Sequence, residues 1–365
     1  MINKSKVGMR IAELRKNIGY SQAKLAEQLN ISTQAVSRWE TGITLADAEQ
    51  LLKLSGIFGV TINYLLLGKG ISIGNDELEI EIRKILNNTE DELTEEELLL
   101  ITDMEIGCNL KLKSLKGLKY LKNLRKLSIK NIYNYIDDLT EISMLTYLKE
   151  FYCGYDIYNQ PAKQAVSLEF LRGLTTLEVL NIAGVKLRDL SPISTLTNLN
   201  KVWLCDDMID DISAFKPLKK LIWVILFDNR IIDISPLENS TELEFIDISM
   251  NLVENLAPLK NCKKLKGINA HTNRFSDASS LEDLINLEAL TLENNYISDI
   301  SALVKLPKLK ELTLSLNQYL KDITPLKKMK ALENVSLFNM DISEETRAEL
   351  NEALPDCNFI YIQDT

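Results

Sequence analysis

Four polar side chains near the amino terminus have the types and the spacing needed to read bases in DNA. Thr33, Gln34, Ser37 and Arg38 fall on one side of a helix when this segment is helical. A glutamine amide can pair with adenine and an arginine guanidinium with guanine, each through two hydrogen bonds. The pattern therefore predicts a recognition helix that enters a groove of double-stranded DNA.

Two helices must pack against each other to position these side chains. Ser21 can cap the first helix and Ser32 the second. One apolar face runs along each helix, formed by Leu25, Ala26 and Leu29 on the first and by Val36 and Trp39 on the second. Asn30 lies between the helices and tolerates the left-handed backbone that a tight turn needs. Residues 21–39 are therefore predicted to form a helix-turn-helix.

This stretch reads SQAKLAEQLNISTQAVSRW and is followed by Glu40, Gly42, Phe58, Val60, Leu65 and Leu66. It resembles the DNA-binding domain of phage repressors and Cro proteins, the XRE family, over residues 7–68. By this resemblance the base-reading positions are Thr33, Gln34 and Arg38, and the positions that contact phosphate or backbone are Gln22, Arg10 and Thr41. From their places on the predicted helix, we add Ser37 to the base-reading set and Ser32 to the phosphate-contacting set.

Five helices are expected in this first domain, which we predict to span residues 1–68 and to end at the turn-rich run GKGISIG. Residues 69–93 form a linker with an amphipathic helix over 75–87. Its apolar face carries Leu78, Ile82, Ile85 and Leu86. This helix is interpreted either as a linker helix resting on a neighbouring domain or as a dimerisation helix.

The charge of the chain is unevenly distributed. The formal net charge is −10, yet residues 1–68 hold eight Lys and Arg against five Asp and Glu. The acidic excess lies in the rest of the chain, which should be repelled from phosphate. We therefore expect a DNA-reading head joined to a body that does not bind DNA.

The body, residues 94–365, repeats itself. The motif LxxLxLxxN begins at Leu221, Leu243, Leu265, Leu287 and Leu309, each 22 residues after the last, and weaker copies extend it in both directions. A unit this short cannot bury its own apolar face, so neighbouring units must stack as a solenoid. Each unit should contribute one short strand to a parallel sheet, with its leucines inward and its asparagine satisfying backbone groups in the turn.

These units resemble the leucine-rich repeats of bacterial internalins, which are exported adhesins. The resemblance implies a parallel sheet on the concave face and short helical turns on the convex face. An Asp begins most of these turns, and we interpret it as a cap for the turn, with a cation site as the alternative. A capping box at Thr94 and Glu97 and a helix with a final strand over 344–362 should close the two ends.

Aromatic and aliphatic side chains between the buried leucines should point outward from the concave face. They are Trp203, Trp223, Ile225, Phe227, Phe245 and Met250, with Tyr152 as an extension. A contiguous apolar patch of this kind predicts a surface that binds a protein or peptide. The alternative is partial burial against a loop or against the DNA-binding head. An insertion near residues 158–166 is either a binding loop or a tolerated insertion.

Several classes of function find no support in the sequence. The cysteines, Cys108, Cys153, Cys205, Cys262 and Cys357, lack paired or metal-ligand spacing, which predicts reduced thiols in a cytoplasmic protein. His271 is the only histidine, so neither a zinc site nor a Ser-His-Asp arrangement is indicated. We expect no cofactor, no enzyme activity and no membrane segment.

The sequence as a whole predicts a transcriptional regulator. A helix-turn-helix would read an operator as a homodimer on two half-sites while the repeats receive a protein or peptide partner. The alternative is an intracellular interaction adaptor or antitoxin-like inhibitor. In that case the helix-turn-helix would serve autoregulation or dimerisation.

Overall fold

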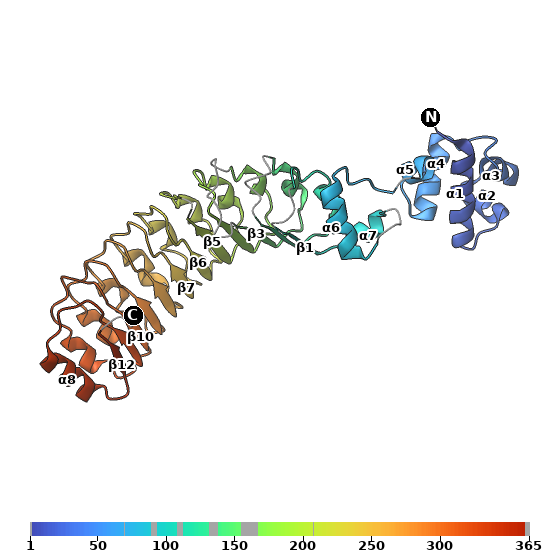
Figure 1. Cartoon of the computed structure of the whole chain (residues 1–365). Coiled ribbons are helices and arrows are strands. Elements are labelled where there is room, and N and C mark those ends of the chain that lie inside the picture. Colours follow the sequence, from blue (N-terminus) through green and yellow to red (C-terminus); the bar gives the residue numbers. More distant parts are fainter. Residues whose placement is uncertain are drawn as a thin grey trace. The chain divides into compact units, whose positions relative to one another are not determined.

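A computed structural model describes residues 2–68, 70–88, 93–107, 112–130, 138–154, 167–206 and 208–361. The chain divides by compactness into two units (Figure 1). One consists of residues 1–102 and 116–122, and the other of residues 103–115 and 123–365. This division groups the linker and the first cap helix with the helical head. The predicted domain limits at residues 68 and 93 stay a prediction.

The head contains the five expected helices: α1 Lys4–Asn17, α2 Gln22–Leu29, α3 Thr33–Glu40, α4 Ala48–Phe58 and α5 Ile62–Leu67. Side-chain oxygens of Ser21 and Ser32 accept hydrogen bonds from backbone N–H groups in the first turns of α2 and α3. Asn30 ends α2 in the left-handed conformation, with φ of 54°. The predicted caps and turn are therefore confirmed. Helix α1 begins at Lys4 because Asn3 caps it.

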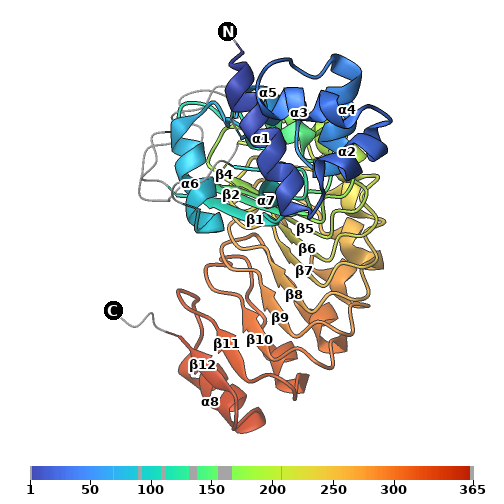
Figure 2. The ribbon, with the colours of Figure 1, turned by 90° about the vertical axis from the view of Figure 1, so that its right-hand side faces the viewer.

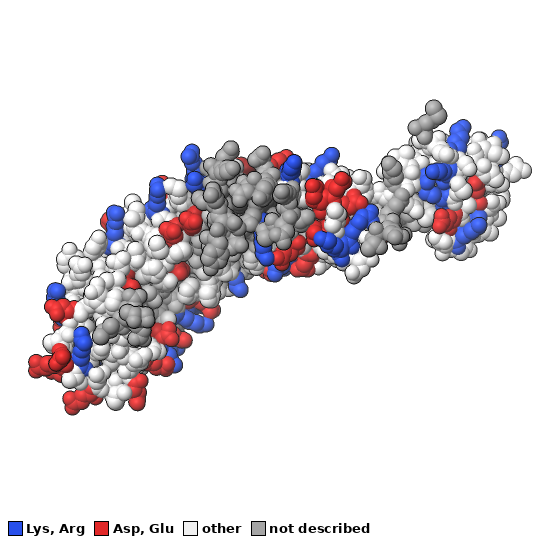
Figure 3. Space-filling model, viewed as in Figure 1, with Lys and Arg blue, Asp and Glu red and all other residues white. Residues whose placement is uncertain are grey.

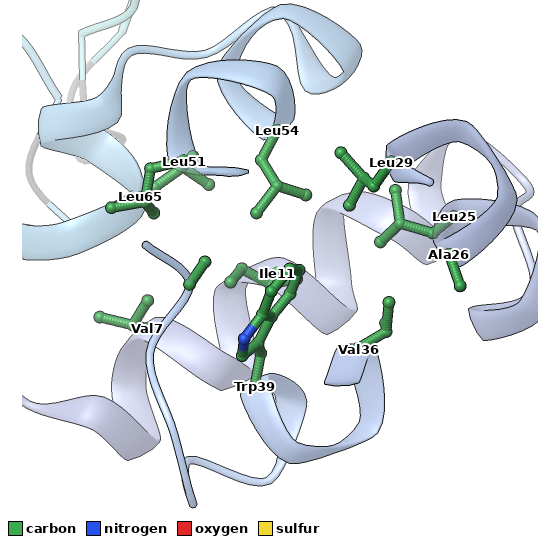
Figure 4. Close-up of a cluster of buried hydrophobic side chains, with 11 residues drawn as sticks. Val7, Ile11, Leu25, Ala26, Leu29, Val36, Trp39, Leu51, Leu54 and Leu65 are labelled. Carbon is green, nitrogen blue, oxygen red and sulfur yellow. The ribbon is translucent and has the colours of Figure 1, made fainter. Parts of the chain in front are cut away.

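One apolar cluster holds the five helices together. Figure 4 shows side chains from α1 to α5 pointing into it, among them Ile11 from α1, Leu25 from α2 and Trp39 from α3. Leu54 and Leu65 close it from α4 and α5, and both are fully buried. Burial of side chains this large contributes roughly 1.5 to 3 kcal/mol each. The cluster therefore fixes α3 from behind, which leaves its outer face free.

The linker helix α6 (Asp76–Leu86) buries a narrower face than the sequence suggested. Leu78 and Ile82 are buried, Leu86 is half-buried and Ile85 is 41% exposed. Helix α7 (Glu95–Leu99) starts with the predicted capping box, in which Thr94 and Glu97 hydrogen-bond to each other's backbone N–H. Both interpretations of α6 remain open.

The repeats form one parallel sheet whose strands follow each other in sequence order (Figure 2). Its strands are β1 Asp103–Ile106, β2 Lys126–Lys130, β3 Glu150–Gly154, β4 Val179–Ala183, β5 Lys201–Cys205, β6 Trp223–Ile225, β7 Phe245–Asp247, β8 Gly267–Asn269, β9 Ala289–Thr291, β10 Glu311–Thr313, β11 Asn334–Ser336 and β12 Asn358–Ile360. Helix α8 (Glu344–Ala353) precedes β12, as expected for the closing cap. The predicted solenoid of stacked strands is confirmed.

Short 3-10 turns lie between the strands. They are η1 Leu118–Tyr120, η3 Thr140–Met144, η4 Glu169–Leu171, η5 Ser191–Thr195, η6 Ser213–Phe215, η7 Ser235–Leu237, η8 Ala257–Asn261, η9 Ser279–Leu281, η10 Ser301–Lys305 and η11 Thr324–Lys328. Asp233 accepts a hydrogen bond from the Ser235 N–H at 2.7 Å, just before η7. Asn255 does the same for Ala257 before η8. The predicted role of these Asp and Asn residues as caps for the short turns is confirmed.

The buried asparagine of each motif hydrogen-bonds to the backbone of its own repeat and of the preceding repeat. The Asn251 Nδ2 donates to the backbone oxygens of Leu226 and Ile248, at 2.8 and 3.1 Å, and its Oδ1 accepts from the Ile231 N–H at 2.9 Å. Asn229, Asn273 and Asn317 repeat this pattern. Because these groups lie out of water, each bond satisfies a backbone group that would otherwise be costly to bury.

Four of the five cysteines and the single histidine lie in the described part of the repeats. Cys153, Cys205, Cys262 and Cys357 form no disulfide bonds in the described part of the chain, and burial raises the pKa of the Cys262 thiol to about 11. His271 is half-buried, with Nδ1 3.1 Å from the Thr272 Oγ1. Cys108 and the insertion near 158–166 lie outside the described residues. Within the described part of the chain, no helix has the length and apolar character needed to cross a membrane.

Candidate nucleic-acid interface

The outer face of α3 presents the residues that the sequence assigned to base reading. Thr33, Gln34 and Arg38 are exposed and Ser37 is half-buried, while Val36 and Trp39 are buried on the opposite face. Amide, hydroxyl and guanidinium groups therefore stand on one side of a single helix. This arrangement can donate to and accept from base edges at the same time.

The two ends of α3 carry the predicted hydroxyl groups. The Ser32 Oγ accepts from the Ala35 N–H at 3.2 Å, which leaves its own proton free to donate to a phosphate oxygen. The Thr41 Oγ1 donates to the Ser37 backbone oxygen at 2.8 Å. Both side chains are exposed. The positive end of the helix dipole adds a favourable field for a phosphate near Ser32.

A buried carboxylate links three of the five helices of the head, α1, α2 and α3. The Arg15 Nε and Nη2 of α1 donate to the two oxygens of Glu40 at the end of α3, at 2.6 and 3.0 Å. The Gln22 Nε2, from the first turn of α2, donates to the same carboxylate at 2.7 Å. The Arg15 and Glu40 side chains are only 10% and 7% exposed. This network fixes α2 and α3 relative to α1.

Electrostatics of the network favour the charged carboxylate. Burial opposes ionisation of Glu40, but the hydrogen bonds from Arg15 and Gln22 and the charge of Arg15 outweigh it. The pKa of the Glu40 carboxyl therefore lies below its usual range. A carboxylate at a helix carboxyl end is otherwise unfavourable because of the helix dipole, and Arg15 offsets that effect.

Close backbone contact also positions α3, at Gly8 of α1. A Cβ at Gly8 would lie 2.2 Å from the Trp39 oxygen and 2.7 Å from the Glu40 oxygen. No side chain fits there without displacing α3 or α1. A glycine inside a helix costs about 1 kcal/mol of stability relative to alanine. The close packing of α1 against α3 explains why a glycine is nevertheless present at position 8. That unfavourable glycine in a helical segment was the sequence signal for the contact, and our sequence analysis missed it.

Arg10 takes a different position from the other predicted DNA contacts. Its Nε donates to the Leu65 backbone oxygen at 3.1 Å, near the end of α5, and the side chain is half-buried. A Cβ on Gly68 would meet the same guanidinium, which shows how closely Arg10 packs there. In the structure Arg10 therefore holds the carboxyl end of α5 against α1. Its contact with the DNA backbone stays a proposal.

The concave face of the repeats brings several predicted aromatic residues together. Trp223 and Phe245 are aligned on β6 and β7, and their rings stack with centroids 4.4 Å apart. Phe245 in turn lies over Gly267 of β8, where a Cβ would come within 2.7 Å of the ring. Trp203 of β5 is aligned with Ile225 of β6, two residues further along the strands than Trp223. Trp223 remains 37% exposed.

Comparison with known proteins decides the family of the head. Residues 11–65 match the family model described as Helix-turn-helix. The HTH-type transcriptional regulator ImmR of Bacillus subtilis is 36% identical over 94 residues, which are 26% of this chain and 72% of the relative. The cryptic phage CTXphi transcriptional repressor RstR of Vibrio cholerae is 31% identical over 87 residues, 24% of this chain and 77% of the relative.

The chain belongs to the helix-turn-helix family of transcriptional regulators. In this regulator residues 285–328 also match the model for Leucine Rich repeats. The crystal structure of the internalin inlF from Listeria monocytogenes has a TM-score of 0.64 and 26% identity, and the match covers 80% of the regulator and 91% of the internalin. The protein is therefore a DNA-binding regulator with a leucine-rich-repeat domain.

Tyr152, Phe227 and Met250 depart from a simple extension of the apolar patch. Asn181 of β4 separates Tyr152 from Trp203 in the register of the regulator's sheet. The Tyr152 hydroxyl donates to the Glu150 carboxylate at 3.0 Å, and burial together with this contact raises the pKa of the phenol. Phe227 follows the end of β6, and Met250 lies in a turn with φ of 53°. The patch is thus centred on β5 to β7.

Proposed function

We propose that this regulator reads an operator with the outer face of α3 and that its repeat domain receives a protein or peptide partner. The observation that supports the first part is the exposed set Thr33, Gln34 and Arg38 on a helix braced from behind by Trp39 and the Glu40 network. Base reading needs such rigidity, because a hydrogen-bonding pair loses discrimination when the helix can shift.

In this proposal each polar group of the head has a separate role. Gln34 pairs with adenine and Arg38 with guanine, while Thr33 and Ser37 contact neighbouring base edges. Gln22 has two N–H donors on its amide nitrogen. One donates to Glu40, and the other is left for a phosphate oxygen. Ser32, Arg10 and Thr41, whose hydroxyl must turn away from the Ser37 oxygen, complete the phosphate contacts, which set affinity and position but not sequence choice.

The proposed DNA-bound form is a homodimer in the cytoplasm. One head makes few contacts, and two heads on half-sites one helical turn apart, about 34 to 36 Å, would add their binding energies. The modest positive charge of residues 1–68 supports binding of the head to DNA, and the acidic remainder is repelled by it.

The second part of the proposal concerns the concave face. A stacked aromatic pair with exposed area, on adjacent strands, is typical of surfaces that bind another protein. Binding of a partner there would change the action of the head at its operator. In the alternative, the repeats carry the cellular activity and the head only regulates its own promoter.

The experiment that tests DNA reading is selection from random oligonucleotides with the full-length protein at low salt. We expect one enriched motif arranged as two half-sites. Recovery of no preferred sequence would overturn the regulator function. An Arg38→Ala variant then separates the alternatives in cells. If it abolishes regulation of all target genes the proposal holds, and if only autoregulation is lost the adaptor is favoured.

A further inference from the structure

The concave face has an acidic end next to its aromatic residues. Asp206 directly follows β5, and Asp228 occupies the matching position after β6. Both residues adopt the left-handed conformation, with φ of 56° and 55°. The Asp206 N–H donates to the Phe227 oxygen at 3.2 Å, which ties the two turns together. Two carboxylates thus stand side by side at the carboxyl ends of neighbouring strands.

These two carboxylates have no partner within the described chain. Neither accepts a hydrogen bond or forms an ion pair there, although Lys and Glu elsewhere in the repeats pair readily. The Lys266 Nζ lies 2.7 Å from a Glu244 oxygen, and the Lys149 Nζ 2.7 Å from a Glu178 oxygen. Figure 3 shows lysines and carboxylates interspersed over the visible face of the repeats. Burial and the neighbouring Asp228 charge raise the pKa of the Asp206 carboxyl.

Backbone geometry alone does not require aspartate at these positions. Equivalent turns carry Met250, Thr272 and Asn294 in the same left-handed conformation. Asparagine would fit that conformation without the repulsion between two carboxylates. A cation placed between the two carboxylates relieves this repulsion, so the pair is complementary to a positively charged group.

Two further polar side chains lie on the neighbouring strands β7 and β8. The Asp247 carboxylate takes the Asn269 Nδ2 at 2.8 Å, and the Asn269 Oδ1 is buried without a hydrogen-bond partner in the described structure. A cation on this face, Lys201, is aligned with Trp223 at the beginning of the strands. The charge therefore changes sign along the strands, from Lys201 at one end to the two carboxylates at the other.

Distance along a strand sets the spacing that a ligand must match. Trp223 and Asp228 are five residues apart, which would be roughly 16 Å in a fully extended chain and is shorter here, because β6 ends at Ile225 and Asp228 is left-handed. Trp203, Ile225 and Phe227 lie between these two ends and are each half-buried. A single side chain cannot span this distance, whereas an extended peptide of about five residues can.

We propose that the concave face over β5 to β8 binds an extended segment of a partner protein that carries an apolar side chain and, roughly five residues away, an arginine or lysine. The apolar side chain packs on Trp223 and Phe245, and the cation lies between Asp206 and Asp228. An arginine suits this place best, because its planar guanidinium can bond both carboxylates. This inference rests on the proposed role of the concave face as a partner surface, and it names the chemistry of that partner.

The test is a selection of random peptides displayed on phage against the full-length protein. Enriched peptides should carry an arginine or lysine separated from an aromatic or large aliphatic residue by four or five positions. One enriched peptide and its Arg→Gln version are then synthesised, and their Kd values are measured by fluorescence anisotropy. Enrichment without basic residues, or no enriched peptide at all, overturns the inference.

Charge-neutral variants locate the binding. We expect Asp206→Asn combined with Asp228→Asn to weaken the arginine peptide about tenfold and to leave the Arg→Gln peptide nearly unchanged, since asparagine tolerates both turns. The control is Asp233→Asn combined with Asp277→Asn. It removes the same charge from capping positions where asparagine already serves at Asn255. Equal weakening by both pairs would mean that only net charge attracts the peptide and would overturn the inference.

DNA binding by the same variants separates the two proposals. The Asp206 and Asp228 pair lies outside the head, so the preferred DNA motif should not change. Loss of a motif in every protein tested, with the charge preference for peptides intact, would remove the operator-reading function and leave the peptide site standing. An intact DNA motif together with peptides that show no charge preference would overturn the peptide site and leave the operator-reading function standing.

Discussion

Arg15 of α1 donates two hydrogen bonds to Glu40 of α3, across a buried contact between the first helix and the recognition helix. Removing Arg15 leaves the buried Glu40 carboxylate without its countercharge, with only the Gln22 amide still donating to it. An Arg15→Met substitution should therefore destabilise the head by about 3 to 5 kcal/mol. We expect the loss to appear as faster hydrogen exchange of α1 to α3, because the stacked repeats need not unfold with them.

The matched control for this prediction is Lys24→Met, which breaks the exposed pair with Glu27 in α2. It should change exchange in α1 to α3 very little. Similar exchange rates for both variants would show that the Arg15 pair does not hold the head together.

Acid should weaken the head through the same carboxylate. The hydrogen bonds from Arg15 and Gln22 outweigh burial and lower the folded-state pKa of Glu40. A group with a lowered pKa stabilises the fold above its unfolded pKa, about 4.3, and this stabilisation is lost as the pH falls through the folded value. Protection of α1 to α3 in the wild type should therefore drop below about pH 4.3. The difference between wild type and Glu40→Gln isolates this effect, and it should shrink as the pH falls through that range.

Local signals made most of the head predictable. Ser21, Ser32 and Asn30 each act within a few residues of their own position, so capping and turn chemistry identified α2 and α3 directly. The contacts of Arg15 and Gly8 with the end of α3 join residues far apart in the chain. A glycine inside a helical segment indicates a close contact but not its partner, and nothing local marks Arg15, so the three-dimensional packing was needed to identify both contacts.

Periodicity made the repeat domain predictable in the same way. A fixed spacing located the strands, the buried asparagines and the capping aspartates, because each has one role in every unit. The concave face was predicted less completely. The sequence indicated that Trp223 and Phe245 point outward, but not that they stack or that Gly267 gives Phe245 its place. The unpaired Asp206 and Asp228 also escaped notice, since pairing depends on which lysines lie near.

A methyl group at Gly8 should displace the recognition helix. Gly8→Ala brings a Cβ within 2.2 Å of the Trp39 backbone oxygen, so α1 or α3 must shift. Overpacking of this kind costs about 1 to 3 kcal/mol. We expect a lower melting temperature of the head and weaker binding to every DNA sequence, measured by fluorescence anisotropy. Gly56→Ala in α4 is the control, because its Cβ meets nothing within 4 Å and alanine favours the helix. A Gly8 variant as stable as the Gly56 variant would contradict the close approach.

Base reading and phosphate contact should separate in the DNA selectivity of single variants. Gln34→Ala or Arg38→Ala removes a pair that discriminates one base, so each should cost about 1 to 3 kcal/mol at the selected site and little on random duplex. Gln22→Ala should instead weaken both duplexes alike, and it should leave the dependence on salt unchanged because a neutral amide releases no counterions. Gln28→Ala, an exposed amide on α2, serves as the control and should bind like the wild type. Titrations of each variant with both duplexes, at two salt concentrations, give these values. If the Gln34 variant lost affinity equally for both duplexes, Gln34 would be a phosphate contact and α3 would need a different orientation in the groove.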